Sequence, residues 1–128
     1  MIQQAVTAHQ QGKFEEAEKI YQKILETDPT NSIIRNNLGV LLCNLDRFDE
    51  AEVSHRKAIE LKSGYEDAHY NLGIVLKELN RFDEAEASYR RAIELKPDYI
   101  EAHNDLGVVL QELNRFDEAE ASYRRAIE

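Results

Sequence analysis

Histidines are the first side chains in this sequence whose type and spacing suggest chemistry. His69 and His103 lie 34 residues apart, and an imidazole can bind a metal ion or exchange a proton near neutral pH. A zinc site needs further ligands, and no Cys or carboxylate stands at zinc-ligand spacing around either histidine. We therefore interpret both as ordinary residues of a helix face, and we expect no metal ion and no cofactor.

Clustered carboxylates are the second candidate for chemistry, because a pair of them can serve as general acid and general base. The clusters are Asp83, Glu84 and Glu86, and their copies Asp117, Glu118 and Glu120. Each cluster also stands where a helix is expected to begin, and the helix dipole favours negative charge there. We interpret these residues as helix-start and solubility residues.

Cys43 is the single cysteine of the chain, so no internal disulfide can form. No histidine is placed beside it by local spacing, and an activated thiol is therefore not expected. The sequence also lacks a Gly-rich phosphate loop and a Gly-x-Ser-x-Gly turn. Because no catalytic constellation is present, we predict that the protein is not an enzyme.

Composition indicates the kind of fold that positions these residues. The chain has 128 residues, a formal net charge of -9, 42% hydrophobic residues, two prolines and no Trp. Abundant Ala, Glu, Leu, Arg and Lys favour an all-α protein. The negative charge disfavours nucleic acid and anionic membranes as partners. No secretion signal or membrane-spanning stretch is evident, so a cytoplasmic location is expected.

Internal repetition organises the sequence. Residues 78–94 recur unchanged as residues 112–128, a shift of 34. The same frame aligns four phenylalanines, Phe14, Phe48, Phe82 and Phe116. We therefore predict a single domain over 1–128, built from repeats 1–31, 32–65, 66–99 and 100–128, of which the first and last are incomplete. A repeat of this length is a small element that buries its apolar face against its neighbours.

Each repeat contains two helix patterns. In the third repeat, Leu72, Leu76 and Leu79 recur at helical spacing, and Asn80 can adopt the left-handed conformation that ends a helix. A second helix follows, whose inward residues are Phe82, Ala85, Tyr89, Ala92 and Ile93. Pro97 then stops it. We expect the small residues Gly73 and Ala85 to mark the closest approach of the two helices.

These positions carry a resemblance to a known family. Leu72, Gly73, Phe82, Ala85, Tyr89, Ala92 and Pro97 match the signature of the tetratricopeptide repeat, and the resemblance covers the whole chain. It implies a solenoid of antiparallel helix pairs that forms a right-handed superhelix, with first helices lining a concave groove that usually binds a peptide or helix of a partner. Departures are Arg35, His69 and His103 in a slot for large apolar residues, and His55 in place of the second aromatic, which is expected to loosen the packing locally.

The first helices supply the candidate binding face. Tyr70 lies about 200° around the helix from the buried Leu72, so its side faces the expected groove. At the repeat spacing this face carries Asn36, Asn37, Val40, Tyr70, Asn71, Ile74, Lys77, Asn104, Asp105 and Val108. Carboxamides both donate and accept hydrogen bonds, which suits the main chain of an extended peptide. Alternatively, the asparagines are solvated or bridge first helices, and the valines belong to the core.

Two subclasses of the family bear on the partner. Residues 68–76 and 102–110 resemble repeats found beside O-linked N-acetylglucosamine transferases and in related bacterial proteins, where an asparagine ladder holds the substrate. Repeats that clamp acidic C-termini of chaperones carry Lys or Arg on this face, whereas Asp67, Asn71, Glu101 and Asp105 stand here. Negative charge also accumulates in the last two repeats. We therefore expect a neutral or basic protein or peptide as partner.

Two functions follow from these patterns. The first is a non-catalytic scaffold for protein–protein interaction that binds a partner through the first helices. The alternative is a self-assembling module that stacks or dimerises through its last repeat, where no further helix is expected to cover Leu110, Leu113, Tyr123 and Ile127.

Overall fold

The computed structural model describes all 128 residues, which form eight α-helices and no β-strand, so the all-α prediction is confirmed. The helices are α1 (Ile2–Gln10), α2 (Phe14–Thr27), α3 (Ser32–Asn44), α4 (Phe48–Leu61), α5 (Glu66–Glu78), α6 (Phe82–Leu95), α7 (Ile100–Glu112) and α8 (Phe116–Ile127). None of them combines the length and the apolar character needed to cross a membrane.

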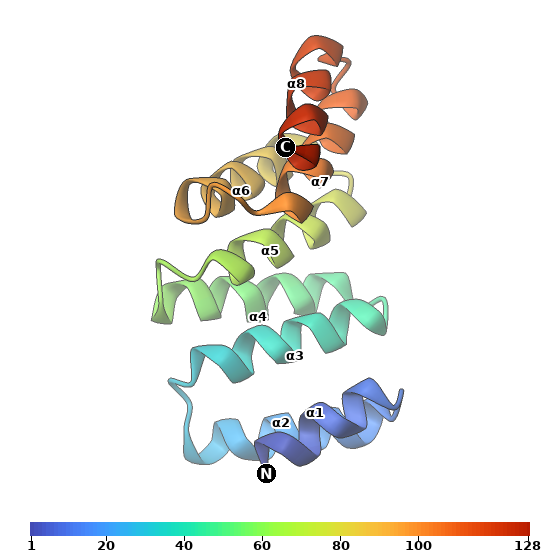
Figure 1. Ribbon diagram of the computed structural model, residues 1–128. Coiled ribbons are helices and arrows are strands. Elements are labelled where there is room, and N and C mark those ends of the chain that lie inside the picture. Colours follow the sequence, from blue (N-terminus) through green and yellow to red (C-terminus); the bar gives the residue numbers. More distant parts are fainter. The chain divides into compact units, whose positions relative to one another are not determined.

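The chain divides into two compact units, Met1–Ser63 and Gly64–Glu128. We call them the N-terminal unit, which contains α1 to α4, and the C-terminal unit, which contains α5 to α8. Consecutive helices lie side by side in pairs within each unit (Figure 1). The single domain expected over 1–128 stays a prediction.

A tight turn joins the two helices of each pair. Asn80 has a φ of 60°, and the Arg81 N–H donates to the Leu76 carbonyl while the Asn80 N–H donates to the Lys77 carbonyl, both at 2.9 Å. These bonds satisfy carbonyls that the end of α5 leaves unpaired. The left-handed conformation predicted for Asn80 is confirmed, and residues 12, 46 and 114 adopt it at the corresponding turns.

Within a helix pair, an aromatic ring packs closely against a glycine. A Cβ added to Gly73 would lie 2.6 Å from Cε1 of Tyr89. The ring of Tyr89 therefore fills the space above Gly73, and the expectation that Gly73 and Ala85 mark the closest approach of the two helices stays a prediction. Tyr123 lies in the same way against Gly107, at 2.6 Å.

His55 occupies this ring position in the N-terminal unit and fills it completely. Its imidazole would lie 2.5 Å from a Cβ at Gly39, and the residue is only 1% exposed. The His55 Nδ1–H donates to Oδ1 of Asn36 at 2.9 Å. At His55 the expected local loosening is therefore absent, since this histidine is as fully buried as Tyr21 and Tyr89 are at the same position.

Arginines connect successive helix pairs within each unit. The Arg47 guanidinium pairs with Glu18 at 2.9 Å in the N-terminal unit, and Arg115 pairs with Glu86 at 2.6 Å in the C-terminal unit. Burial alone would raise the pKa of Glu86, but the hydrogen bonds from Arg115 and Arg90 outweigh it and lower that pKa. Partly exposed pairs contribute roughly 0–1 kcal/mol. We therefore infer that these ion pairs fix how neighbouring helix pairs are aligned and add little to the stability of the fold.

The last repeat differs from the sequence prediction at one position. Leu110 was expected to lack cover, but it is 0% exposed, and its helix α7 packs against both α6 and α8. The apolar side chains that do reach solvent at this end are Phe116 and Ile127, at 60% and 87% exposure.

Candidate functional site

The predicted binding face is distributed over both units, and each part is described by itself. In the N-terminal unit, Asn37 and Val40 of α3 are half-buried, whereas Asn36 is only 5% exposed and its carboxamide oxygen accepts from His55. In the C-terminal unit, α5 and α7 carry the remaining predicted residues. These are the half-buried Tyr70, Asn71, Ile74, Lys77, Asp105 and Val108 and the exposed Asn104.

Tyrosines and aspartates form a continuous row in the C-terminal unit. The Tyr99 hydroxyl donates to Oδ1 of Asp67, and the Tyr70 hydroxyl donates to Oδ2 of Asp105, both at 2.6 Å. The rings of Tyr70 and Tyr99 lie with their centroids 5.0 Å apart. We call Asp67, Tyr99, Tyr70 and Asp105 the Tyr–Asp row, since each member contacts the next from the start of α5 to α7.

No basic side chain pairs with either carboxylate of the row. Asp67 and Asp105 accept hydrogen bonds from neutral phenols, and neither has a Lys or Arg partner. Burial, and next the hydrogen bond to its aspartate, raises the pKa of each phenol, so Tyr70 and Tyr99 stay protonated donors. Lys96 lies over the ring of Tyr99, 4.7 Å from its centroid, rather than on a carboxylate.

A third tyrosine lies beneath the row. The Tyr89 ring centroid is 5.8 Å from that of Tyr70, and its hydroxyl is buried without a hydrogen-bond partner. The corresponding Tyr123 donates to Gln111. In the third repeat Lys77 stands in place of Gln111, and an ammonium group has no acceptor atom for the phenol. The phenol of Tyr89 therefore has no acceptor here of the kind that Tyr123 finds in Gln111.

Reasoning from sequence placed Tyr70 and Asp105 on the binding face but did not identify Tyr99. This residue is 7% exposed, and it reaches Asp67 from the segment just before α7. A signal was available, because Tyr65 and Tyr99 recur one repeat apart, each directly before a first helix.

His103, one of the two histidines considered first, contacts the main chain before α7. His103 is 7% exposed, and its Nε2 lies 2.8 Å from the Pro97 carbonyl oxygen, so it helps to hold the turn before α7. No group of three or more His, Cys, Asp or Glu side chains lies close enough together to hold a metal ion.

Comparison with known proteins identifies the family. Profiles described as tetratricopeptide repeat match residues 8–54, 66–99 and 88–121. The solved structure of the first TPR of Spaghetti (RPAP3), bound to the HSP90 peptide SRMEEVD, is 30% identical, with a TM-score of 0.86, covering 88% of this chain and 89% of that chain. The chain belongs to the tetratricopeptide-repeat family.

Other tetratricopeptide-repeat structures share the fold at lower identity. MamA from Desulfovibrio magneticus RS-1 is 17% identical, with a TM-score of 0.90, covering 98% of this chain and 71% of that chain. MamA AMB-1 is 23% identical, with a TM-score of 0.81, covering 95% of this chain and 67% of that chain. No curated protein sequence matches the chain. The helix pairs described above are thus those of a tetratricopeptide-repeat solenoid.

Proposed function

We propose that this chain is a non-catalytic interaction module whose Tyr–Asp row binds a protein segment carrying a Lys or Arg side chain. The observation that supports this most is the pair of carboxylates, Asp67 and Asp105, each held by a phenol at 2.6 Å and each without a cation. Because the phenols fix the carboxylates in place, the carboxylates lose little conformational entropy when a basic side chain pairs with them. The non-catalytic role and the cytoplasmic location stay predictions from the sequence.

Polar and apolar neighbours of the row suit the rest of such a segment. Asn104 is exposed beside Asp105, and its carboxamide can both donate to and accept from a peptide main chain. Ile74 and Val108 are half-buried on α5 and α7 and offer apolar contact. In the N-terminal unit, Asn37 and Val40 offer the same two kinds of contact on α3.

The ligand proposed here differs in charge from the peptide bound by the solved relative. The TPR of Spaghetti (RPAP3) binds the peptide SRMEEVD, which is acidic at its C-terminal end. In this chain, Asp67, Glu101 and Asp105 stand where a clamp for an acidic terminus would need Lys or Arg. We therefore propose that a basic segment binds more tightly than an acidic one.

Neutralising the row is expected to weaken a basic peptide about threefold, since its single Lys forms one partly exposed ion pair, which contributes roughly 0.5–1 kcal/mol. The variant is Asp67→Asn with Asp105→Asn, because an asparagine oxygen still accepts from the tyrosine. Fluorescence anisotropy would follow labelled alanine-rich octapeptides that carry a central Lys, Gln or Glu. The Lys peptide should lose affinity, whereas the Gln peptide should not.

A matched variant separates the row from the overall charge of the chain. Asp83→Asn with Asp117→Asn removes the same charge from exposed positions at the starts of α6 and α8. The Lys peptide should bind this variant as it binds the wild type. Equal losses in the two double variants, or no preference for Lys over Glu in the wild type, would contradict a binding role for the row.

Self-association is a second candidate, favoured by the apolar end of α8. A cavity of about 350 Å³ lies there between α7 and α8, and Phe116 and Ile127 on its rim are 60% and 87% exposed. Apolar side chains grouped around a cavity are suited to contact with a second copy. We propose this surface as the contact if the chain dimerises.

Sedimentation velocity over a range of concentrations tests the second candidate. The average mass of the wild type should rise with concentration, and Ile127→Lys should return it to that of the monomer. Val53 is 69% exposed in the N-terminal unit, so Val53→Lys is the matched control and should leave association unchanged. A wild-type mass that stays monomeric throughout would eliminate this candidate.

A further inference from the structure

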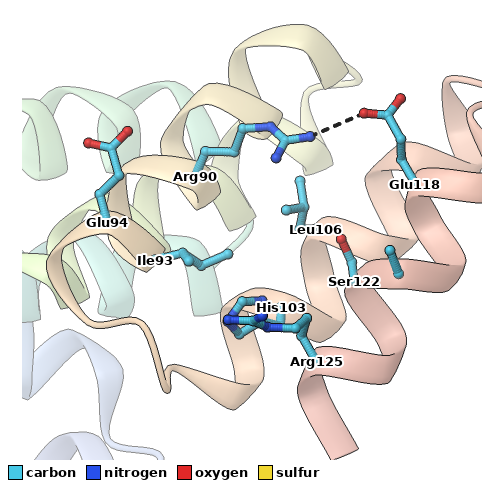
Figure 2. A pocket seen from close by; sticks show the side chains of 9 residues that line it. Arg90, Ile93, Glu94, His103, Leu106, Glu118, Ser122 and Arg125 are labelled. Carbon is cyan, nitrogen blue, oxygen red and sulfur yellow. Dashed lines mark ion pairs between the residues drawn. The ribbon is translucent and has the colours of Figure 1, made fainter. Parts of the chain in front are cut away.

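A cavity of about 420 Å³ lies between α6 and α8 of the C-terminal unit and extends down to α7 (Figure 2). Its apolar lining includes Ile93 of α6 and Leu106 of α7. This volume falls within the range of small-molecule sites in proteins. None of the residues that line the cavity belongs to the Tyr–Asp row, so a ligand here would be independent of the peptide proposed above.

Two buried polar groups of the cavity have hydrogen-bonding capacity to spare. The His103 Nε2–H donates to the Pro97 carbonyl at 2.8 Å, which leaves Nδ1 of the neutral ring as an acceptor. Ser122 is 8% exposed and lines the cavity, and its hydroxyl can donate as well as accept a hydrogen bond. Figure 2 shows both side chains in the same space between α6 and α8. A ligand that accepts from Ser122 and donates to His103 would use this capacity.

The charges around the cavity leave one cation unmatched. Glu94 pairs with Arg91 at 2.8 Å, and Glu118 pairs with Arg115 at 2.7 Å. Figure 2 also draws an ion pair from Arg90 to Glu118, whereas Arg125 has none. The cavity therefore presents a single uncompensated guanidinium, even though the whole chain is acidic.

We propose that this cavity binds a carboxylate attached to a small apolar body. Arg125 pairs with the carboxylate, Ser122 donates to it, and Ile93 and Leu106 contact the apolar body. A short organic acid and the apolar C-terminal residue of a peptide share this chemistry. They differ in one respect, because only the peptide has a backbone N–H that can donate to Nδ1 of His103.

NMR titration of the full chain with three small probes tests the chemistry. N-acetyl-leucine should shift the amide signals of residues that line the cavity. N-acetyl-leucinamide, which lacks the charge, should bind at least about tenfold more weakly, because a charge-assisted hydrogen bond is lost. Hexanoate has the carboxylate and apolar body without the amide. Equal affinity for hexanoate identifies a free acid as the ligand, and weaker affinity identifies a peptide C-terminus.

Two variants locate the site. Arg125→Gln should weaken N-acetyl-leucine about tenfold and leave N-acetyl-leucinamide unchanged, and it should fold normally since Arg125 makes no ion pair. Ala121 is exposed at the cavity, so Ala121→Phe should block binding of every probe. The matched control is Ala87→Phe, which alters the corresponding exposed alanine of α6 outside the cavity and should bind as the wild type does.

Several results would overturn the proposal. They are equal affinity for N-acetyl-leucine and its amide, an Arg125→Gln variant that binds the acid normally, and no saturable shift up to the solubility limit of the acid. Equal effects of Ala121→Phe and Ala87→Phe, or shifts confined to the Tyr–Asp row, would place binding elsewhere. None of these outcomes bears on the proposed peptide site, which is tested by different ligands and different variants.

Discussion

Lowering the pH from 7 to 5 is expected to destabilise the chain by about 2 kcal/mol through His55 alone. The imidazole is 1% exposed, and burial lowers its pKa to about 4 from the ordinary 6.5. Its Nδ1–H donates to Asn36 at 2.9 Å, so the folded chain holds the neutral ring. Protonation of the buried ring would place a charge where no counter-ion faces it.

The direction of the effect follows from proton binding in the two states. Between pH 6.5 and pH 4 the histidine of the unfolded chain is largely protonated, while the folded chain keeps it neutral. Because the unfolded state holds more protons there, the free energy of unfolding falls as the pH falls. The contribution of His55 is fully present above pH 6.5, and about 3 kcal/mol is lost by pH 4.

His55→Tyr isolates this contribution, because tyrosine fills the same position in the other three repeats. Urea unfolding, followed by circular dichroism at pH 7 and pH 5, gives the free energy of unfolding at each pH. The wild type should lose about 2 kcal/mol more than the variant over this interval. Carboxylates contribute equally to both proteins, so their effect cancels. If both proteins lost the same amount, the neutral, buried state of His55 would be contradicted.

The repeats and helices could be predicted from sequence because their signals are local or periodic. Leu72, Leu76 and Leu79 reveal a helix by their spacing, and Asn80 reveals the turn that follows. The pairing of Tyr70 with Asp105, 35 residues away, was not predictable. Placing residues on helix faces indicates which way their side chains point, but not how far apart two side chains on different helices lie. The same limit applies to Leu110, since helix periodicity places it on a face without showing what covers it.

Net charge was a similarly incomplete guide to binding. A value of -9 indicates a neutral or basic partner for the chain as a whole. The charge that a ligand meets depends on local pairing, however. Asp67 and Asp105 accept from phenols and have no ion-pair partner. The carboxylates at the cavity are paired, and Arg125 is left without a partner. One acidic unit can therefore offer a site for a cation and another for an anion.

Gly73→Ala is expected to destabilise the chain by about 1–3 kcal/mol, the usual cost of overpacking. The added Cβ would lie 2.6 Å from Cε1 of Tyr89, and this ring is 0% exposed. The ring cannot move without displacing Tyr70, whose centroid lies 5.8 Å away. The clash therefore exceeds the roughly 1 kcal/mol that alanine gains over glycine within a helix.

Gly107→Ala is the matched control, because it creates the same contact against a ring that can move. The added Cβ would lie 2.6 Å from Cε1 of Tyr123, but this tyrosine is half-exposed on α8 and can swing toward solvent. We expect a change within about 1 kcal/mol, since relief of the clash and the gain in helix propensity offset one another. Urea midpoints compare the two variants, and Gly73→Ala with Tyr89→Leu should recover part of the loss. Equal midpoints for the two alanine variants would mean that the ring of Tyr89 moves aside as readily as that of Tyr123. The burial of Tyr89 would then not explain why glycine is needed at position 73.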